Sequence, residues 1–189
     1  MSDPRDPALG DELLPEANMV FDRCAIIAAS AAEVWPWLVQ LGKHRAGWYL
    51  PAHLERLLPS DRRASRTLDP RWQTLGVGER VPDYGGSEEY LEVVRIEPAR
   101  ALVYRSERRG ARFTWALLLS ALSPGETELR LRFRGQLKSS GWQRRAIVAA
   151  GDFFDWSTSE LMLCGLRERV AHTDRTPFVG PPRVRGWWM

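Results

Sequence analysis

The sequence of 189 residues contains no long hydrophobic run, because charged and turn-forming residues interrupt every apolar stretch. A bilayer span needs about 20 consecutive apolar residues, so no membrane helix is expected. The first residues, MSDPRDPALGDELLPE, are acidic and contain proline, and they lack the apolar segment of a secretory signal peptide. These features predict a cytoplasmic protein.

Cysteine and histidine are scarce. Cys24 and Cys164 both lie in apolar runs and form no C-x-x-C pair, a pattern typical of buried, reduced thiols in a cytosolic protein. His44, His53 and His172 lie far apart, without an H-x-x-x-H motif or a Cys-His cluster. The sequence therefore predicts neither a metal site nor a cofactor.

Motifs of several enzyme and nucleotide-binding classes are missing as well. The sequence has no G-x-S-x-G, and the G-V-G of residues 76–78 is not followed by the helical pattern that a dinucleotide site requires. The 27 Lys and Arg residues are interspersed with 24 Asp and Glu residues, which gives a formal net charge of +3. This excess is too small to indicate a nucleic-acid partner.

Tryptophan, in contrast, is abundant. The chain has nine, within a composition of 44% hydrophobic and 27% charged residues that is ordinary for a soluble globular domain. Each indole gains free energy when its large apolar surface leaves water. We expect residues 1–18 to form a flexible arm, residues 19–172 a single domain, and residues 173–189 a tail rich in Pro, Gly and Trp. That tail either frays or docks onto this chain or a neighbour.

The first half of the domain reads as one strand followed by two short helices. The run MVFDRCAIIA predicts a strand from Met19. Ser30 and Glu33 have capping-box spacing, and the helix they begin is expected to end at Gly42 and to bend at Pro36. The leucines of residues 50–58 form one stripe, which predicts a short amphipathic helix.

The second half predicts an antiparallel meander and then a long helix. Four segments alternate with a period of two, and they are residues 87–98, 101–107, 111–122 and 127–135. In the last segment three leucine or phenylalanine positions alternate with arginines, which predicts one apolar face and one solvated face. The solvated face would carry Arg130, Arg132 and Arg134. The inward face should also carry Phe113, Trp115, Leu117 and Leu119. From residue 141 to 172 the pattern is helical.

This order of elements is α+β, and three stretches of it resemble the SRPBCC superfamily, which includes START lipid-transfer domains, birch-pollen-allergen-like proteins and polyketide cyclases. The stretches are ASAAEVWPWLVQLG, AGWYLPAHLERLL and DFFDWSTSELMLCGLRERV. The likeness covers residues 19–172 and is greatest to bacterial members labelled only as SRPBCC family proteins. It implies a helix-grip fold, in which a curved antiparallel sheet wraps around the C-terminal helix and leaves a deep hydrophobic cavity. It implies no particular reaction.

The side chains expected at that cavity are aromatic and aliphatic residues that alternation or helical phase aims inward. Trp48 and Tyr49 follow a basic turn bounded by glycines, and they serve either as core packing or as the rim of the pocket. The Tyr90 face of its strand is taken as the inward one. The predicted ligand-binding residues are Trp48, Tyr49, Tyr90, Tyr104, Phe113, Trp115, Leu117, Leu131 and Phe154.

Three residues are candidates for acid–base chemistry. A carboxylate beside aromatic rings in a dry site has a raised pKa, and Asp155 and Glu160 lie among Phe and Trp residues of the long helix. His53 is expected at the mouth of the cavity, where a histidine side chain is suited to acid–base chemistry. Each of the three could equally be a surface residue or the partner of an arginine.

The sequence therefore predicts a protein that binds a hydrophobic or aromatic small molecule, lipid-like or polyketide-like, in a cavity between sheet and helix. One alternative is a polyketide cyclase or dehydratase that uses the same cavity. Another is an interaction module that forms a homodimer through its Trp-rich tail.

Overall fold

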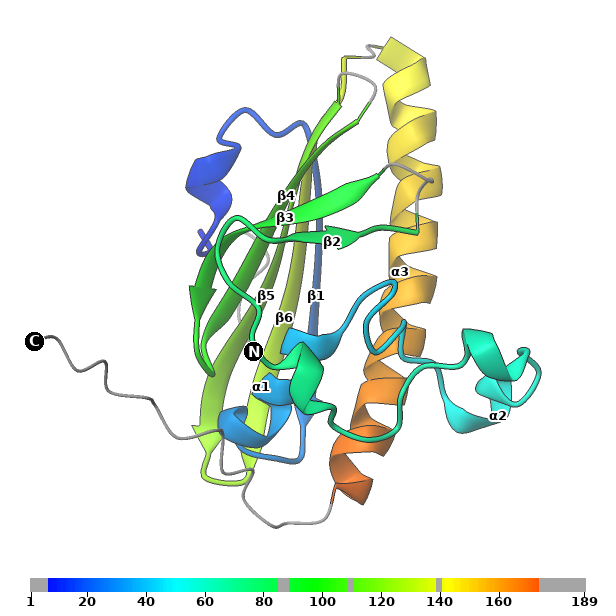
Figure 1. Ribbon diagram of the computed structural model, residues 1–189. Helices are drawn as coiled ribbons and strands as arrows, with labels where there is room; N and C mark the ends of the chain where they lie inside the picture. The colour runs from blue at the N-terminus through cyan, green and yellow to red at the C-terminus, as the bar shows by residue number, and fades with distance from the viewer. Residues whose placement is uncertain (1–6, 85–88, 109–110, 139–140, 174–189) are drawn as a thin grey trace, which may run out of the picture.

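The computed structural model describes residues 7–84, 89–108, 111–138 and 141–173. They form a six-stranded antiparallel sheet, with one long helix beside it and short helices at one end (Figure 1). The strand order is β1-β6-β5-β4-β3-β2. The strands are β1 (Met19–Ile27), β2 (Arg80–Pro82), β3 (Tyr90–Glu97), β4 (Ala101–Arg108), β5 (Ala111–Ser123) and β6 (Glu126–Gln136). The α+β helix-grip architecture predicted from the sequence is confirmed.

The register of the meander gives the sheet one apolar inner face, on the side of the helices. Trp115 pairs with Phe133 across β5 and β6, and Leu117 pairs with Leu131. Phe21 on β1 also pairs with Phe133. The predicted common face of residues 113–119 and 129–133 is therefore confirmed.

Helix α1 (Ala31–Gln40) begins as its sequence predicts. The Ser30 side chain accepts a hydrogen bond from the Glu33 backbone N–H, while the Glu33 carboxylate accepts one from the Ser30 backbone N–H. Pro36 lies inside the helix. Trp37 and Leu38 are fully buried against the inner face of the sheet, so α1 closes one end of the core.

The second predicted helix is shorter than expected. Helix α2 (Ala52–Glu55) is a single turn, and Leu57 is exposed instead of completing an apolar stripe. The reason is an ion pair: the buried Glu55 carboxylate accepts a hydrogen bond from the Arg169 guanidinium at 2.5 Å. This contact fixes the turn against the long helix, and the chain leaves it directly afterwards. Three 3-10 turns complete the connections, namely η1 (Asp11–Leu13), η2 (Ser60–Arg62) and η3 (Pro70–Trp72).

Helix α3 (Gly141–His172) has two unlike halves. From Ser159 onward it packs into the core through Met162, Leu163 and Leu166. A Cβ atom on Gly165 would lie 2.7 Å from the Leu50 backbone, so only glycine allows this approach. Before Ser159, every described residue of the helix is at least partly exposed.

The outer face of the sheet is covered by the segment before β1, which corrects one prediction from the sequence. Arg130 and Arg132 are only 7% and 5% exposed, because both pair with Asp22 on β1. Arg132 also pairs with Asp11 in the covering segment, at 2.8 Å. The expected solvated arginine face is therefore wrong.

Residues 7–18, expected as a loose arm, lie against this outer face. Gly10 adopts a φ of 98°, and a Cβ there would lie 3.0 Å from the Val103 side chain on β4. Leu14 is buried, and its carbonyl accepts a hydrogen bond from Arg134 at 3.0 Å. The arginines of β6 thus hold residues 7–18, the covering segment, in place.

Candidate functional site

The inner face of the sheet carries a continuous layer of aromatic rings. Ring centroids of successive neighbours lie 5.5–6.4 Å apart, at the spacing of favourable aromatic pairs. The ring pairs form two groups, and the groups meet where Trp115 and Phe133 are directly opposite each other on β5 and β6. We call this set the aromatic layer, and its members are Phe21, Trp48, Tyr84, Tyr104, Phe113, Trp115 and Phe133.

The aromatic layer is buried at Tyr104 and Phe21, and its other members are partly or strongly exposed. Tyr104 is 2% exposed, whereas Phe113, Trp115 and Trp48 are only half-buried and Tyr84 is exposed. The layer extends beyond the part of the sheet that the buried half of α3 covers. This combination leaves several ring surfaces incompletely covered by the chain's own side chains.

Trp48 and Tyr49, consecutive in the sequence, have different roles. Tyr49 is fully buried, and its hydroxyl donates a hydrogen bond to the Trp37 carbonyl at 2.8 Å. The Arg169 guanidinium lies 4.5 Å from its ring centroid. Trp48 instead stacks on Trp115, with the ring centroids 5.9 Å apart. Tyr49 is therefore core, and Trp48 belongs to the aromatic layer.

Other predicted ligand-binding residues are also core. Leu117 and Leu131 are buried beneath α1 and α3, and Tyr104 forms the base of the aromatic layer. Burial, opposed by nearby Arg45, raises the pKa of the Tyr104 hydroxyl, so this group stays protonated. Phe113 and Trp115 remain as half-buried members of the aromatic layer.

The predicted inward face of β3 is wrong. Tyr90 lies on the outer face, where the Arg80 guanidinium stacks over its ring at 4.3 Å. Val93 and Leu91 face inward instead, and Val93 is fully buried. Tyr90 thus lines a groove on the other side of the sheet.

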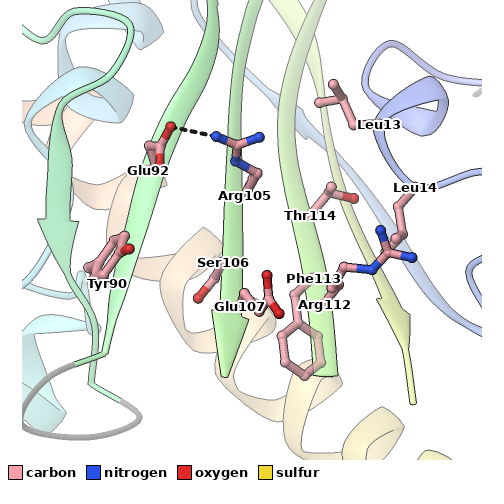
Figure 2. Close-up of a pocket in the computed structure, with 10 residues that line it drawn as sticks. All are labelled: Leu13, Leu14, Tyr90, Glu92, Arg105, Ser106, Glu107, Arg112, Phe113 and Thr114. Carbon is pink, nitrogen blue, oxygen red and sulfur yellow. Dashed lines mark hydrogen bonds and ion pairs between the residues drawn. The ribbon is translucent and has the colours of Figure 1, made fainter. Parts of the chain in front are cut away.

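Figure 2 shows this outer groove, of about 430 Å³, between the covering segment and strands β3, β4 and β5. Its wall contains the cross-strand ion pair of Arg105 with Glu92, at 2.8 Å. The groove is lined mainly by polar and charged side chains, with Leu13 and Leu14 from the covering segment. It is unlike the apolar cavity predicted from the sequence.

Three further candidates are on the surface. Phe154 is 69% exposed on α3, so its predicted inward orientation is wrong. Glu160 is exposed on the same helix, and His53 is exposed on α2. None of the three contacts the aromatic layer through a hydrogen bond or ion pair among the described residues.

Asp155 is the one acid–base candidate that the structure brings to the inner face. Its carboxylate lies 3.3 Å from Arg23 Nε, on the strand that also carries Phe21, two residues earlier on the same face. The two atoms are misaligned, and neither has a hydrogen-bond partner. Burial raises the pKa of Asp155 to about 6 against the attraction of Arg23, and the Asp152 carboxylate adds to the rise.

Sequence analysis did not place Phe21 and Tyr84 in the candidate site, nor Arg23, which lies beside the aromatic layer. Phe21 and Arg23 alternate inward on β1, so their placement could have been read from the period of that strand. Tyr84 lies in a loop after β2, where no periodicity exists to place it. Its ring reaches the layer edge-on to Trp48, with centroids 6.4 Å apart.

Comparison with solved structures identifies the fold. A protein from Mesorhizobium loti, MLL2253, is 20% identical, with 82% of this chain and 98% of that chain covered and a TM-score of 0.50. An HSP90 activator from Plasmodium falciparum is 14% identical, with 82% and 97% covered and a TM-score of 0.52. The chain shares its α+β helix-grip fold with these two proteins.

A third solved structure with this fold, DynU16 from the dynemicin biosynthetic locus, is 13% identical, with a TM-score of 0.50. The match covers 82% of this chain but 48% of DynU16, so the chain spans about half of that protein. No protein-family model matches the sequence, and no curated protein matches it.

Metal-binding clusters and membrane helices are both absent from the part of this chain that the structure describes. No group of three or more His, Cys, Asp and Glu side chains there could hold a metal ion. None of the helices found there is both long enough and apolar enough to cross a membrane.

The partly buried position of Asp155 predicts that the free energy of unfolding depends on pH. Its pKa is about 6 in the folded chain, against 3.8 for an ordinary aspartate, so the folded chain binds the proton more tightly than the unfolded one. Stability from this group is therefore greatest below about pH 4 and falls as the pH rises to 6 and above. We expect the stability of the wild type relative to Asp155→Asn to fall by about 1–3 kcal/mol between pH 4 and pH 7.

Urea denaturation at a series of pH values measures this difference. Ser159→Ala is the matched control, because Ser159 is buried one turn further along α3 and does not titrate in this range. It should shift the whole pH curve without changing its shape. Parallel curves for the wild type and Asp155→Asn would contradict the raised pKa.

Proposed function

We propose that the protein binds a hydrophobic or aromatic small molecule on the aromatic layer, between the sheet and the N-terminal half of α3. The observation that supports this most directly is the partial exposure of Phe113, Trp115 and Trp48 on the inner face of the sheet. Partly covered aromatic rings bind apolar ligands, because the ligand removes the remaining ring surface from water.

The base of the aromatic layer supports the same proposal. Tyr104 is fixed by burial, with the Trp115 ring stacked on it at 5.8 Å. A ligand ring placed on Trp115 would therefore meet a preorganised surface, and binding would cost little side-chain entropy. The long helix supplies the opposite wall, and its N-terminal half has few contacts to lose when a ligand enters.

The test is binding of the neutral dye N-phenylnaphthylamine, followed by its fluorescence. We expect Trp115→Ala to weaken dye binding at least tenfold, because it removes the stacking surface at the centre of the layer. Trp115→Phe keeps an aromatic surface and should lose less than threefold. Circular dichroism establishes that both variants are folded.

The matched control is Trp142→Ala. Trp142 is also a tryptophan, but it lies 76% exposed on α3 and contacts no ring of the aromatic layer. Its replacement should leave dye binding unchanged. If Trp142→Ala weakens binding and Trp115→Ala does not, the dye binds the outside of the helix and the proposal fails.

A second candidate function, acid–base catalysis on the same bound molecule, is favoured by Asp155. A carboxyl with a pKa of about 6 can hold or release a proton near neutral pH, as a cyclase or dehydratase requires. Native mass spectrometry provides the test. The wild type should convert a molecule retained by Asp155→Asn into a product whose mass is lower by that of one water molecule. An unchanged mass would leave binding as the function.

A further inference from the structure

The N-terminal half of α3 carries an uncovered aromatic stripe on the side away from the sheet. Residues 142, 149, 153 and 156 are spaced by seven, four and three positions, so they share one side of the helix. Figure 1 shows no described element beyond this half of α3. We call Trp142, Ala149, Phe153 and Trp156 the outer stripe.

The outer stripe is large and strongly exposed. Phe153 and Trp156 are 68% and 50% exposed, and their ring centroids lie 6.0 Å apart. The opposite side of the helix faces inward, because a Cβ on Gly151 would lie 3.2 Å from the Phe21 ring. Adjacent aromatic rings left in water on a helix surface indicate a docking site.

We propose that the outer stripe is the docking site for this chain's own C-terminal segment, with Trp187 and Trp188 packed against Phe153 and Trp156. The segment 174–189 lies outside the described residues. Its sequence, DRTPFVGPPRVRGWWM, carries the two indoles just before its last residue, and they supply apolar area to cover the exposed rings of the outer stripe.

The length of the segment is sufficient for this contact. Thr173 is placed at the end of α3, where its hydroxyl accepts a hydrogen bond from Trp37 Nε1 at 3.2 Å. From there Trp156 lies 17 residues back along the helix, a distance of about 25 Å. The 14 residues from Thr173 to Trp187 span roughly 43 Å when extended, and the prolines favour extension.

The charges are complementary at the Glu160 end of the outer stripe. Glu160 lies one turn after Trp156, is exposed, and makes no ion pair with a described residue. Residues 175–189 contain three arginines and no acidic residue, and Arg185 is two positions before Trp187. Arg145, exposed between Trp142 and Ala149, makes the other end of the stripe basic. The arginines of the segment are therefore expected beside Glu160, the end that an anionic membrane would avoid.

The experiment uses a bimane fluorophore on Ala149→Cys, exposed on the outer stripe one turn before Phe153, in the full chain with Cys24→Ser and Cys164→Ser. Bimane is quenched when an indole touches it, so a docked segment keeps it dim. Replacing Trp187 and Trp188 by Phe should brighten it at least twofold. Phe153→Ser should brighten it similarly, whereas Phe154→Ser, equally exposed on another side of the helix, should not.

A charge exchange tests the orientation. Glu160→Arg and Arg185→Glu should each brighten the bimane, and the two together should restore the quenching. Quenching that disappears on dilution would assign the contact to a second copy, and brightness unaffected by the Trp187 and Trp188 replacements would exclude the segment. Binding to anionic phosphatidylglycerol vesicles that needs Phe153 but not the segment would make the stripe a membrane contact. Each of these three results overturns the proposal.

Discussion

Replacing Arg169 by alanine is expected to destabilise the protein by about 3 kcal/mol, because it leaves the buried Glu55 carboxylate with only the more exposed Arg66 as its ion-pair partner. Arg169 is 1% exposed and donates hydrogen bonds to Glu55 at 2.5 Å and to the carbonyls of Ser65, Leu50 and Gly165 at 2.8, 3.1 and 2.9 Å. One side chain thus connects α3 to α2 and to the loops on either side of α2. Its loss removes a charge pair, three backbone contacts and the stacking on Tyr49.

Urea denaturation measures this effect, and Arg167→Ala is the matched control. Arg167 lies two residues earlier on α3, is exposed, and donates to the Ile26 carbonyl at 3.2 Å. Its replacement should change stability by less than about 1 kcal/mol. In a double-mutant cycle, Arg169→Ala and Glu55→Gln should couple by about 2 kcal/mol or more. Additive effects would show that the pair does not act as a unit.

The second large effect is expected from Asp22→Ala on the outer face, with a loss of about 3–5 kcal/mol. The Asp22 carboxylate bridges Arg130 and Arg132, and all three side chains are nearly buried. Without it, two guanidiniums remain under the covering segment without their shared anion. The covering segment, held by the pair of Arg132 with Asp11, should then become accessible to proteases.

Chemical denaturation and limited proteolysis test these two consequences together. The control is Glu126→Ala, since Glu126 is exposed at the start of β6 and should contribute less than about 0.5 kcal/mol. If Asp22→Ala costs as little as the control, the arginines do not depend on Asp22. Unchanged proteolysis near residues 7–18 in a destabilised variant would separate the segment from the arginine network.

Much of the fold could be predicted from the sequence, because local patterns determine it. Ser30 and Glu33 specify the start of α1, and alternation of leucine with arginine specifies the inner face of β6. The outer face was predicted wrongly for a physical reason. Alternation shows which side chains share a face but not what covers that face, and the segment that covers Arg132 lies more than a hundred residues earlier.

The candidate site was less predictable, since small irregularities reverse the orientation of side chains. The register of β3 shifts between Val93 and Arg95, so Val93 and Ile96, three residues apart, both face inward. A strict period of two cannot give that result. Tyr90 lies before the shift, where alternation separates the two faces correctly, but alternation alone does not show which face points inward. On α3, apolar residues occur on several sides of the helix, so periodicity alone could not show that Phe154 points outward.

The close approach of Gly165 to Leu50 gives α3 a fixed end. The helix is clamped there by backbone contact and by Arg169 one turn later. Its first half is held by the more exposed pairs of Arg23 with Asp152 and Asp155 and by the approach of Gly151 to Phe21. Because exposed ion pairs contribute less than buried ones, we expect local opening of α3 to begin in the first half and to leave the clamped end in place.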